Sequence, residues 1–399
     1  MRPLHVLVPL IAVACPPPPA PPPPVTTPGP EVVVAPVGVP GIAARAGAVD
    51  GSDQNSDEFI WRAFVAFTTP VPDTDLVLFE TWATDADTFS TTPTWPDGPS
   101  TRRFQASRLA ASKGGGIDVP CNPPQGAATA GFPTHGTPTP CIAEEVRRNK
   151  VEFDYIVENE LNTQTGLAAA YAAGLDVQMP TDAISFKGDW VPVQTMIAWI
   201  PSLTSPEQVR ELYYTHTQDS GPAAGEYALV SVHVSSRQNP NWVWGTFEHE
   251  LNPGRCDDIG CYDTFGATRA EVPPDHATIN TQYGACEKSP ALARLMGEAR
   301  VSLVWQHYCL KSTQVDYMGE DGLPSVLGNS VIERITGNGT VAASSCIACH
   351  QYASYGADGA VPPAALAILP YNPTGNPIPA VLTDARKFDF TWGVLNAPK

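Results

Sequence analysis

Hydrophobic residues recur at helical spacing in five segments of the chain. In residues 56–68, SDEFIWRAFVAFT, the side chains of Ile60, Phe64 and Phe67 fall on one face of a helix that Ser56 can cap. Similar spacing, together with caps and closing glycines, predicts four further helices, over residues 143–162, 165–174, 289–297 and 325–337.

Alternating or continuous apolar runs predict strands over residues 183–190, 226–236, 241–250 and 300–310. In the second of these, Val230, Val232 and Val234 are expected to face one way, while Ser231 and His233 face the other. The second and third strands are joined by RQNPN, so they are expected to pair antiparallel. The predicted fold class is therefore α+β, with mixed helices and a central antiparallel sheet.

Composition narrows the class of partner. The 399 residues include 41 Asp and Glu against 23 Lys and Arg, which gives a formal net charge of −18 at pH 7. This charge argues against nucleic acid, because binding to phosphates needs Lys and Arg. An acidic surface fits a basic protein partner, although it can also serve solubility alone.

The chain opens with MRPLHVLVPLIAVAC, where one basic residue precedes an apolar run that ends in Ala14-Cys15. The pattern predicts an export signal over residues 1–15. It is similar to a lipoprotein-type signal peptide, in which Cys15 carries the lipid; the alternative is a signal cut elsewhere. Residues 16–50 are rich in proline, which favours a stiff tether or a plain linker. The expected location is extracytoplasmic, in the periplasm or at the cell surface, on a lipid anchor in the membrane.

The stretch SSCIACH near the C-terminus has the spacing of a covalent haem site. Cys346 and Cys349 are one helical turn apart, so both thiols can form thioethers with the two vinyl groups of one haem. His350 follows at once and can bind the iron as the proximal ligand. A zinc half-site would need a second ligand pair, and a redox C-x-x-C would need a βαβ setting; neither is evident. The predicted cofactor is one covalent haem c (heme c).

The remaining cysteines predict disulfides. Of nine cysteines, six remain once Cys15, Cys346 and Cys349 are set aside, and an even remainder in an exported chain suggests three bridges. Six cysteines allow about fifteen pairings. Proximity along the chain favours Cys121–Cys141, Cys256–Cys261 and Cys286–Cys309.

The second axial ligand of the iron is not set by the motif. No methionine follows His350, so a protein ligand would have to come from the body of the chain. The candidates are Met179, Met196, Met296, Met318, His135, His216, His233, His249, His276 and His307. His233, on a predicted strand, is the favoured one and His249 the next; the iron could instead be open or bind water.

Beyond the motif, several stretches resemble a family of exported bacterial proteins described as monohaem cytochrome c family proteins. They are FDYIVENEL, ISFKGDW, LVSVHVSSRQNPNWVWGTFEHELNP, LGNSVIERI followed by SSCIACH, and KFDFTWGVLNA, within residues 56–395. The resemblance implies a single covalent haem held by Cys346, Cys349 and His350. The family pattern has glycine where this chain has Ser231. One haem-carrying domain is expected over residues 51–399, with a haem segment, about 326–399, packed on the main body.

Three functions fit these features. The first is an electron carrier for a redox partner protein, and the acidic charge of the chain fits a basic partner. The alternative is a haem enzyme acting on peroxide, nitric oxide or an organic substrate at an open iron, with Lys187, Glu248 or His249 as acid or base. A ligand sensor or binding module is the third, since a motif alone does not fix function.

Overall fold

The computed structural model describes residues 56–98, 143–218, 224–278, 280–319, 322–331, 333, 344–368 and 382–399. All of these belong to one compact unit, Glu31–Lys399. The predicted signal peptide and tether, with Cys15, lie outside the described residues, and so do Cys121, Cys141 and His135.

A mainly antiparallel sheet forms the centre of the described chain. Its order is β1-β2-β3-β5-β6-β9, and β4 pairs with β5 at one end. The strands of this sheet are β1 (Ala83–Thr84), β2 (Ala143–Arg148), β3 (Ile184–Pro192), β4 (Thr215–Gln218), β5 (Gly225–Ser236), β6 (Val243–His249) and β9 (Tyr308–Gln314). Two small hairpins lie outside it, β7 (Cys261–Tyr262) with β8 (Glu271–Val272) and β10 (Ser354–Tyr355) with β11 (Arg386–Lys387). The predicted α+β class with a central antiparallel sheet is confirmed.

Helices surround the sheet and are mostly short. The α-helices are α2 (Ser56–Phe67), α3 (Asp85–Thr88), α5 (Lys150–Glu158), α6 (Gln164–Ala172), α7 (Val193–Trp199), α8 (Pro206–Leu212), α9 (Pro290–Glu298), α11 (Cys346–His350) and α12 (Pro363–Ile368). The 3₁₀ helices are η1 (Leu78–Thr81), η2 (Leu303–His307) and η5 (Trp392–Asn396). The predicted helices at 56–68, 165–174 and 289–297 correspond to α2, α6 and α9.

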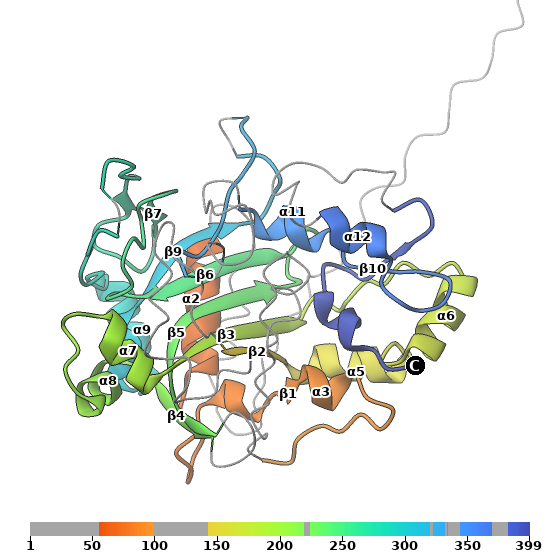
Figure 1. Ribbon diagram of the computed structural model, residues 1–399, viewed down its shortest axis with the longest axis horizontal. Helices are drawn as coiled ribbons and strands as arrows, with labels where there is room; N and C mark the ends of the chain where they lie inside the picture. The colour runs from red at the N-terminus through yellow and green to blue at the C-terminus, as the bar shows by residue number, and fades with distance from the viewer. Residues whose placement is uncertain are drawn as a thin grey trace, which may run out of the picture. The chain divides into compact units, whose positions relative to one another are not determined.

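The largest apolar core lies between α2 and one face of the sheet. Figure 1 shows α2, in orange, crossing the strands. Its Phe64 ring lies 4.2 Å from the ring of Phe247 in β6, centroid to centroid. Ile60 approaches Gly245 so closely that a Cβ there would lie 2.5 Å from an Ile60 methyl carbon. A glycine in the middle of β6 is therefore the condition for this helix to pack on the sheet.

Residues 143–162 do not form the single helix predicted from their pattern. Their first six residues form strand β2, and α5 begins only after Asn149, whose side chain caps it. The charges that suggested a solvated helix are buried and paired: Arg147 Nη2 lies 2.6 Å from Glu145 Oε1, and both side chains are inaccessible to solvent. Pairing of β2 with β3 thus overrides the local helical preference.

A bulge changes the faces of β5. Val230 is the extra residue where β5 pairs with β3. Leu229 consequently joins Val232 in the core next to α2, whereas Val230 belongs to a separate apolar cluster with Val331. The predicted common face for Val230 and Val232 is wrong, because one extra residue reverses the alternation.

The segment 300–310 also differs from the strand predicted for it. Residues Leu303–His307 form η2, and the strand β9 starts only at Tyr308 and continues to Gln314. Trp305 of η2 is fully buried in the core beside α2, so a turn of helix places this ring where an extended chain would not.

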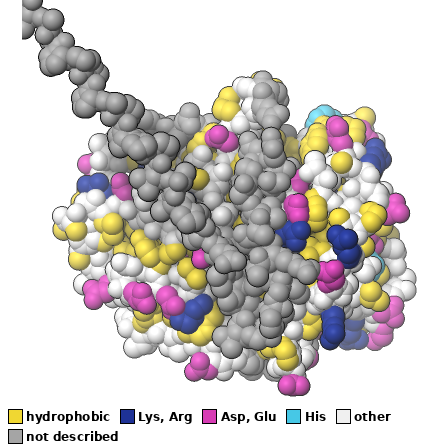
Figure 2. All heavy atoms as spheres, turned by 180° about the vertical axis from the view of Figure 1, so that it is seen from behind, with side chains coloured by type: hydrophobic (Ala, Val, Ile, Leu, Met, Phe, Trp, Pro, Cys, Tyr) yellow, Lys and Arg dark blue, Asp and Glu magenta, His cyan; other side chains and the backbone are white. Residues whose placement is uncertain are grey.

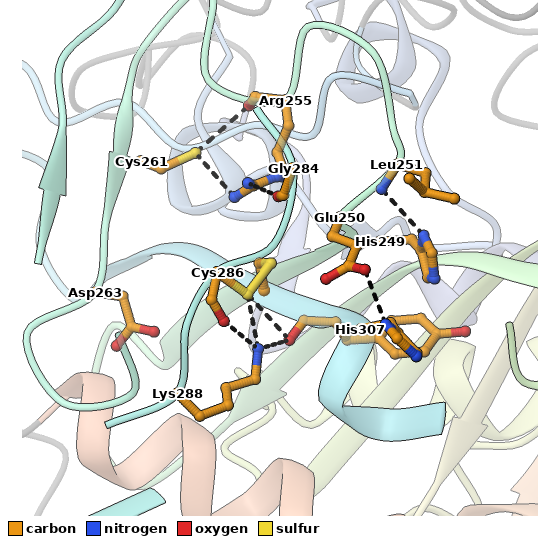
Figure 3. Close-up of a disulfide and its surroundings, with 12 residues drawn as sticks. His249, Glu250, Leu251, Arg255, Cys261, Asp263, Gly284, Cys286, Lys288 and His307 are labelled. Atoms are coloured by element: carbon orange, nitrogen blue, oxygen red, sulfur yellow. Dashed lines mark hydrogen bonds and ion pairs between the residues drawn. A yellow bond between two sulfur atoms is a disulfide. The ribbon is translucent and has the colours of Figure 1, made fainter. Parts of the chain in front are cut away.

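Two of the three predicted disulfides lie in the described chain, with the pairing expected from proximity. Cys256–Cys261 closes a short loop, and Cys286–Cys309 joins the segment before α9 to β9. Figure 3 shows the second, where Lys288 Nζ lies 2.7 Å from Cys286 Sγ and donates to the Tyr308 carbonyl at 2.9 Å. Burial lowers the pKa of Lys288 to about 8. The bridge holds the long excursion between β6 and α9 against the sheet.

Among the described residues, we find no helix with the length and apolar character needed to span a membrane.

Candidate functional site

The helix that contains the two motif cysteines, α11, is held on the end of the sheet by Gln314 of β9. The Gln314 side chain accepts a hydrogen bond from Ile347 N at 3.0 Å and donates to Ser345 Oγ at 2.9 Å. Ser345 also caps α11, since its Oγ accepts from Ala348 N at 3.2 Å. Ile347 is buried in a cluster that includes Trp242 of the turn before β6. The C-terminal segment thus packs on the main body, as predicted.

Both motif cysteines are half-buried thiols on α11. Cys346 packs against the apolar cluster that contains Trp244, and its Sγ lies 3.8 Å from the Leu327 carbonyl oxygen. Cys349 packs against a different cluster, which contains Trp392. The two thiols therefore emerge one helical turn apart between two apolar walls, a setting suited to an apolar macrocycle joined through both sulfurs.

His350 is oriented by a hydrogen bond from its ring to the backbone. Nδ1 lies 2.7 Å from the Phe390 carbonyl oxygen, so Nδ1 carries the proton and donates it. In this tautomer the lone pair that can bind a metal is on Nε2. The Trp244 ring packs 4.6 Å from the imidazole, centroid to centroid. Histidine ligands of metals are commonly fixed in this way.

The carbonyl that accepts this hydrogen bond comes from an unusual turn. Asp389 and Phe390 both have left-handed backbone conformations, with φ of 41° and 66°. Such a pair is rare for residues other than glycine and is often found at functional sites. The Asp389 carboxylate braces the turn, because its Oδ2 accepts from Arg237 Nε at 2.8 Å and from Met179 N at 2.6 Å.

Trp244 shows which face of the sheet α11 covers. It pairs with Ser235 of β5, and directly paired residues of antiparallel strands point to the same side. His233 lies two residues before Ser235 in an unbroken register, so it is on that face, about 7 Å farther along the strand. The predicted proximal ligand, His350, and the favoured second ligand, His233, are therefore on the same side of the sheet.

Ionisable side chains continue along this face, which we call the polar face. Lys187 of β3 pairs with His233 and forms an ion pair with Glu144 of β2, with Nζ and Oε2 2.6 Å apart. In the next row, Asp189 Oδ2 accepts from Ser231 Oγ at 2.9 Å. Burial raises the pKa of Asp189 well above its usual range, although the nearby Lys187 ammonium lowers it. A carboxyl group in this setting keeps its proton to higher pH than an exposed aspartic acid does.

A second charge pair on the same face is fully buried. Lys311, the extra residue of a bulge between β6 and β9, donates to Glu248 Oε1 at 3.2 Å, and both side chains are inaccessible to solvent. Glu248 also accepts from the backbone and hydroxyl of Ser330, the backbone bond being 2.8 Å. Bulges are common beside functional sites, where they turn a side chain toward a new partner.

The segment that supplies Ser330 lies along the polar face as a strap, and its residues 325–329 are not helical, in contrast to the helix predicted over 325–337. Leu327 N donates to the Ser344 carbonyl at 3.0 Å, next to α11. Farther along, Asn329 Nδ2 donates to Thr246 Oγ1 at 3.1 Å. A helical hydrogen bond follows, from Glu333 N to the Asn329 carbonyl at 3.2 Å; residues 332 and 334–337 lie outside the described chain.

The other histidine candidates have different surroundings. His249 Nε2 donates to the Leu212 carbonyl at 3.0 Å and its Nδ1 accepts from Leu251 N at 3.2 Å, so both ring nitrogens are used. Burial lowers the pKa of His249 well below its usual range. His307 Nδ1 lies 2.9 Å from a Glu250 carboxylate oxygen (Figure 3). These histidines are structural residues distant from α11 in the sheet.

The remaining candidates are spread through the molecule. His216 on β4 lies 3.4 Å from a carboxylate oxygen of Glu80, and His276 is exposed. The candidate methionines are divided among three apolar clusters and one exposed position: Met296 in the α2 core, Met196 on α7 in a second cluster, Met179 in the cluster of α11, and Met318 near the surface. Met179 is anchored at its backbone by Asp389, on the Nδ1 side of His350.

Sequence reasoning found the thiols and His350, but it missed Gln314, Phe390 and the strap. The pairing of Lys187 and Glu248 with other ionisable groups on one face was also missed, although FKGDW and FEHE place charged residues inside buried strands. Across the described ranges, no group of three or more His, Cys, Asp and Glu side chains gathers that could hold a metal ion, so no second ligand pair for zinc joins the cysteines there.

Comparison of the chain with protein-family models, curated proteins and solved structures finds no match.

Proposed function

We propose that this protein is a c-type cytochrome that carries single electrons on one haem, joined covalently to Cys346 and Cys349. The observation that carries the proposal is the hydrogen bond from His350 Nδ1 to the Phe390 carbonyl, because it presents Nε2 as the iron ligand on the helix that holds both thiols. The resemblance to exported monohaem cytochromes c supports the same assignment.

The residues present fit this group. The two thiols would form the thioethers, His350 would bind the iron, and the apolar residues around α11 would exclude water from the macrocycle. When bound, haem supplies reversible one-electron exchange between ferric and ferrous iron. The protein supplies the axial ligand, its hydrogen bond and the surrounding dielectric, which together set the reduction potential.

In this proposal His233 would be the second protein ligand of the iron. It shares a face of the sheet with His350, whereas His249 uses both ring nitrogens in the core. Carbon monoxide binds ferrous haem only where an axial position is open or weakly held. The visible spectrum of the reduced protein is therefore expected to stay unchanged under carbon monoxide, and the His233→Ala protein is expected to bind the gas readily.

The exposed His276 provides the control, and His276→Ala is expected to behave as the unsubstituted protein. If neither the parent nor His233→Ala responds to carbon monoxide, His233 is not the ligand. If the parent itself binds carbon monoxide, the iron is open, and the alternative function below is favoured.

The turn at Asp389 and Phe390 is expected to affect the reduction potential of the iron. A neutral hydrogen bond is worth about 1 kcal/mol, which corresponds to roughly 40 mV for a one-electron couple. Asp389→Ala removes the bonds from Arg237 and Met179, so the Phe390 carbonyl moves away from Nδ1–H and the imidazole becomes a weaker donor. The reduction potential is expected to rise by tens of millivolts, measured by spectroelectrochemical titration.

The matched control is Glu226→Ala, which breaks the two hydrogen bonds from Arg210 at the opposite end of β5. That change is expected to leave the potential where it was. Equal potentials for the parent and Asp389→Ala would contradict a role for this turn in setting the strength of the axial ligand.

A haem enzyme is the alternative function, and the polar face is the observation that favours it. Asp189, Lys187 and Glu248 are ionisable groups on the side of the sheet that carries α11, and Asp189 and Glu248 are buried. An electron carrier needs no such groups, whereas reduction of peroxide or nitric oxide needs proton donors near the iron. An open iron in the carbon monoxide experiment, together with turnover of peroxide that Asp189→Asn abolishes, would favour this alternative.

We also propose that the protein is exported and that Cys15 is lipidated, with residues 16–50 as the tether. Support comes from the signal-like sequence and from the two disulfides, which form and persist in oxidising compartments. Covalent haem attachment outside the cytoplasm is consistent with that location.

A further inference from the structure

A hairpin between β9 and α11, described over residues 316–319 and 322–326, carries exposed apolar side chains. Leu323 is 62% exposed, Met318 45% and Val326 36%. Half of the exposed large hydrophobic residues of the described chain thus fall in one short segment. On the face drawn in Figure 2, by contrast, hydrophobic side chains are scattered among charged ones. Clustered exposed apolar residues usually mark a contact surface.

The hairpin is held at its base. Ser325 N donates to the Tyr317 carbonyl at 2.9 Å, and Gly319 N donates to the Leu323 carbonyl at 2.8 Å. Gly322 has a φ of 74°, the left-handed backbone conformation that the turn requires. Figure 1 shows this segment projecting from the body beside α11. Its apolar side chains are therefore presented on an ordered support.

The same hairpin is bonded to the helix of the motif cysteines. Gln314 Nε2 donates to Ser325 Oγ at 2.7 Å and also to Ser345 Oγ at 2.9 Å. Immediately after the hairpin, the Leu327 carbonyl lies 3.8 Å from Cys346 Sγ. A protein that contacts the hairpin would lie next to the thioether of Cys346, where an electron could enter or leave.

The charge of the segment selects the kind of partner. Residues 316–326 contain Asp316, Glu320 and Asp321 and no Lys or Arg, in a chain of formal net charge −18. A second copy of this chain would bring the same negative charge to the contact, and anionic lipid would repel it as well. A basic protein with a small apolar patch has complementary chemistry.

We propose that Met318, Leu323 and Val326 form the docking surface for a basic one-electron carrier protein. The proposal rests on the proposed function, since it needs a haem on α11. The apolar side chains exclude water from the centre of a small, transient contact, and the net negative charge of the chain steers the basic partner toward it. Such contacts bury little area and dissociate quickly, as repeated electron exchange requires.

Stopped-flow oxidation of the reduced holoprotein by a small basic c-type cytochrome tests this proposal. The test variant is Leu323→Gln with Val326→Gln, which removes apolar area without changing charge. The second-order rate constant is expected to fall about tenfold, equivalent to about 1.4 kcal/mol of lost contact, and to fall with added salt in the parent. The matched control is Leu303→Gln in η2, where Leu303 is 74% exposed; its rate is expected to equal that of the parent.

Oxidation by hexaammineruthenium(III), which needs no docking surface, is expected to be the same for all three proteins. The proposal is overturned by an unchanged rate in the double variant, by an equal fall in Leu303→Gln, or by no reaction of the parent with the basic cytochrome. Self-association of the parent that the double variant abolishes would assign the surface to a second copy, and binding to anionic vesicles would assign it to lipid. Failure of the proposed function itself would be seen earlier, as absence of covalent haem in the parent.

Discussion

Replacing both Cys346 and Cys349 by serine is expected to abolish covalent haem completely. The two sulfurs lie one helical turn apart on α11, and serine cannot form a thioether with a haem vinyl group. The protein would be produced in a host that attaches haem outside the cytoplasm. Haem would then be detected by its peroxidase stain on a denaturing gel and by the intact mass of the chain.

The controls for this experiment use other cysteines of the same chain. Replacing Cys256 and Cys261 by serine breaks a short-loop disulfide far from α11 in the sequence, so covalent haem is expected to remain. Each single substitution at the motif is expected to leave one thioether. Retention of haem by the double serine variant after denaturation would place the attachment elsewhere and refute the assignment.

Lys311→Met is expected to destabilise the protein by about 3–5 kcal/mol, because it leaves Glu248 buried without its counter-charge. Ser330 still donates two hydrogen bonds to this carboxylate, which keeps the loss at the lower end of that range. The free energy of unfolding would be measured by guanidinium denaturation, followed by tryptophan fluorescence.

Removing both charges separates the cost of an unpaired charge from the value of the pair. The double variant Lys311→Met with Glu248→Gln is expected to be more stable than Lys311→Met alone. Lys150→Met, which breaks an exposed ion pair with Asp154, is the control and is expected to change stability by less than about 1 kcal/mol. If Lys311→Met were as mild as this control, the pair on the polar face would not be a buried, mutually dependent one.

Much of the fold could be predicted from the sequence where local pattern and tertiary packing agree. Helix α2 has acidic residues in its first turn and apolar residues at helical spacing, and both features favour the same helix. The antiparallel pairing of β5 with β6 follows from two alternating runs and a short connection. Elements of this kind need no distant residue to specify them.

The predictions are wrong where residues far away in the sequence determine the local conformation. Strand β2 has a helical charge pattern, but its arginines find buried carboxylates, among them Asp85 from before the long gap in the described chain. The bulge at Val230 cannot be read from β5 alone, because it depends on the register with β3. Residues 325–331 contain apolar positions that suit a helix. Asn329, however, donates to Thr246 and Ser330 donates to Glu248, and these bonds hold the segment along the sheet.

The candidate site also has a part that the sequence predicts and a part that depends on distant residues. Cys346, Cys349 and His350 are contiguous, so the chemistry of the motif is visible in seven residues of sequence. Its support is not contiguous: Gln314 lies on β9, and the Phe390 carbonyl depends on a left-handed turn in which phenylalanine is not a typical choice. The association of His233 with this side of the sheet required the strand register, which the sequence could only suggest.

The most direct test of the central claim is the alkaline pyridine haemochrome spectrum of the purified holoprotein, recorded together with the protein concentration. Attachment through Cys346 and Cys349 saturates both vinyl groups, so the α band is expected at the position of haem c, at shorter wavelength than that of haem b, with one haem per chain. Haem that is extracted into acidified organic solvent, or a spectrum of haem b type, would contradict the account. Absence of haem from protein produced with an active attachment system would contradict it as well.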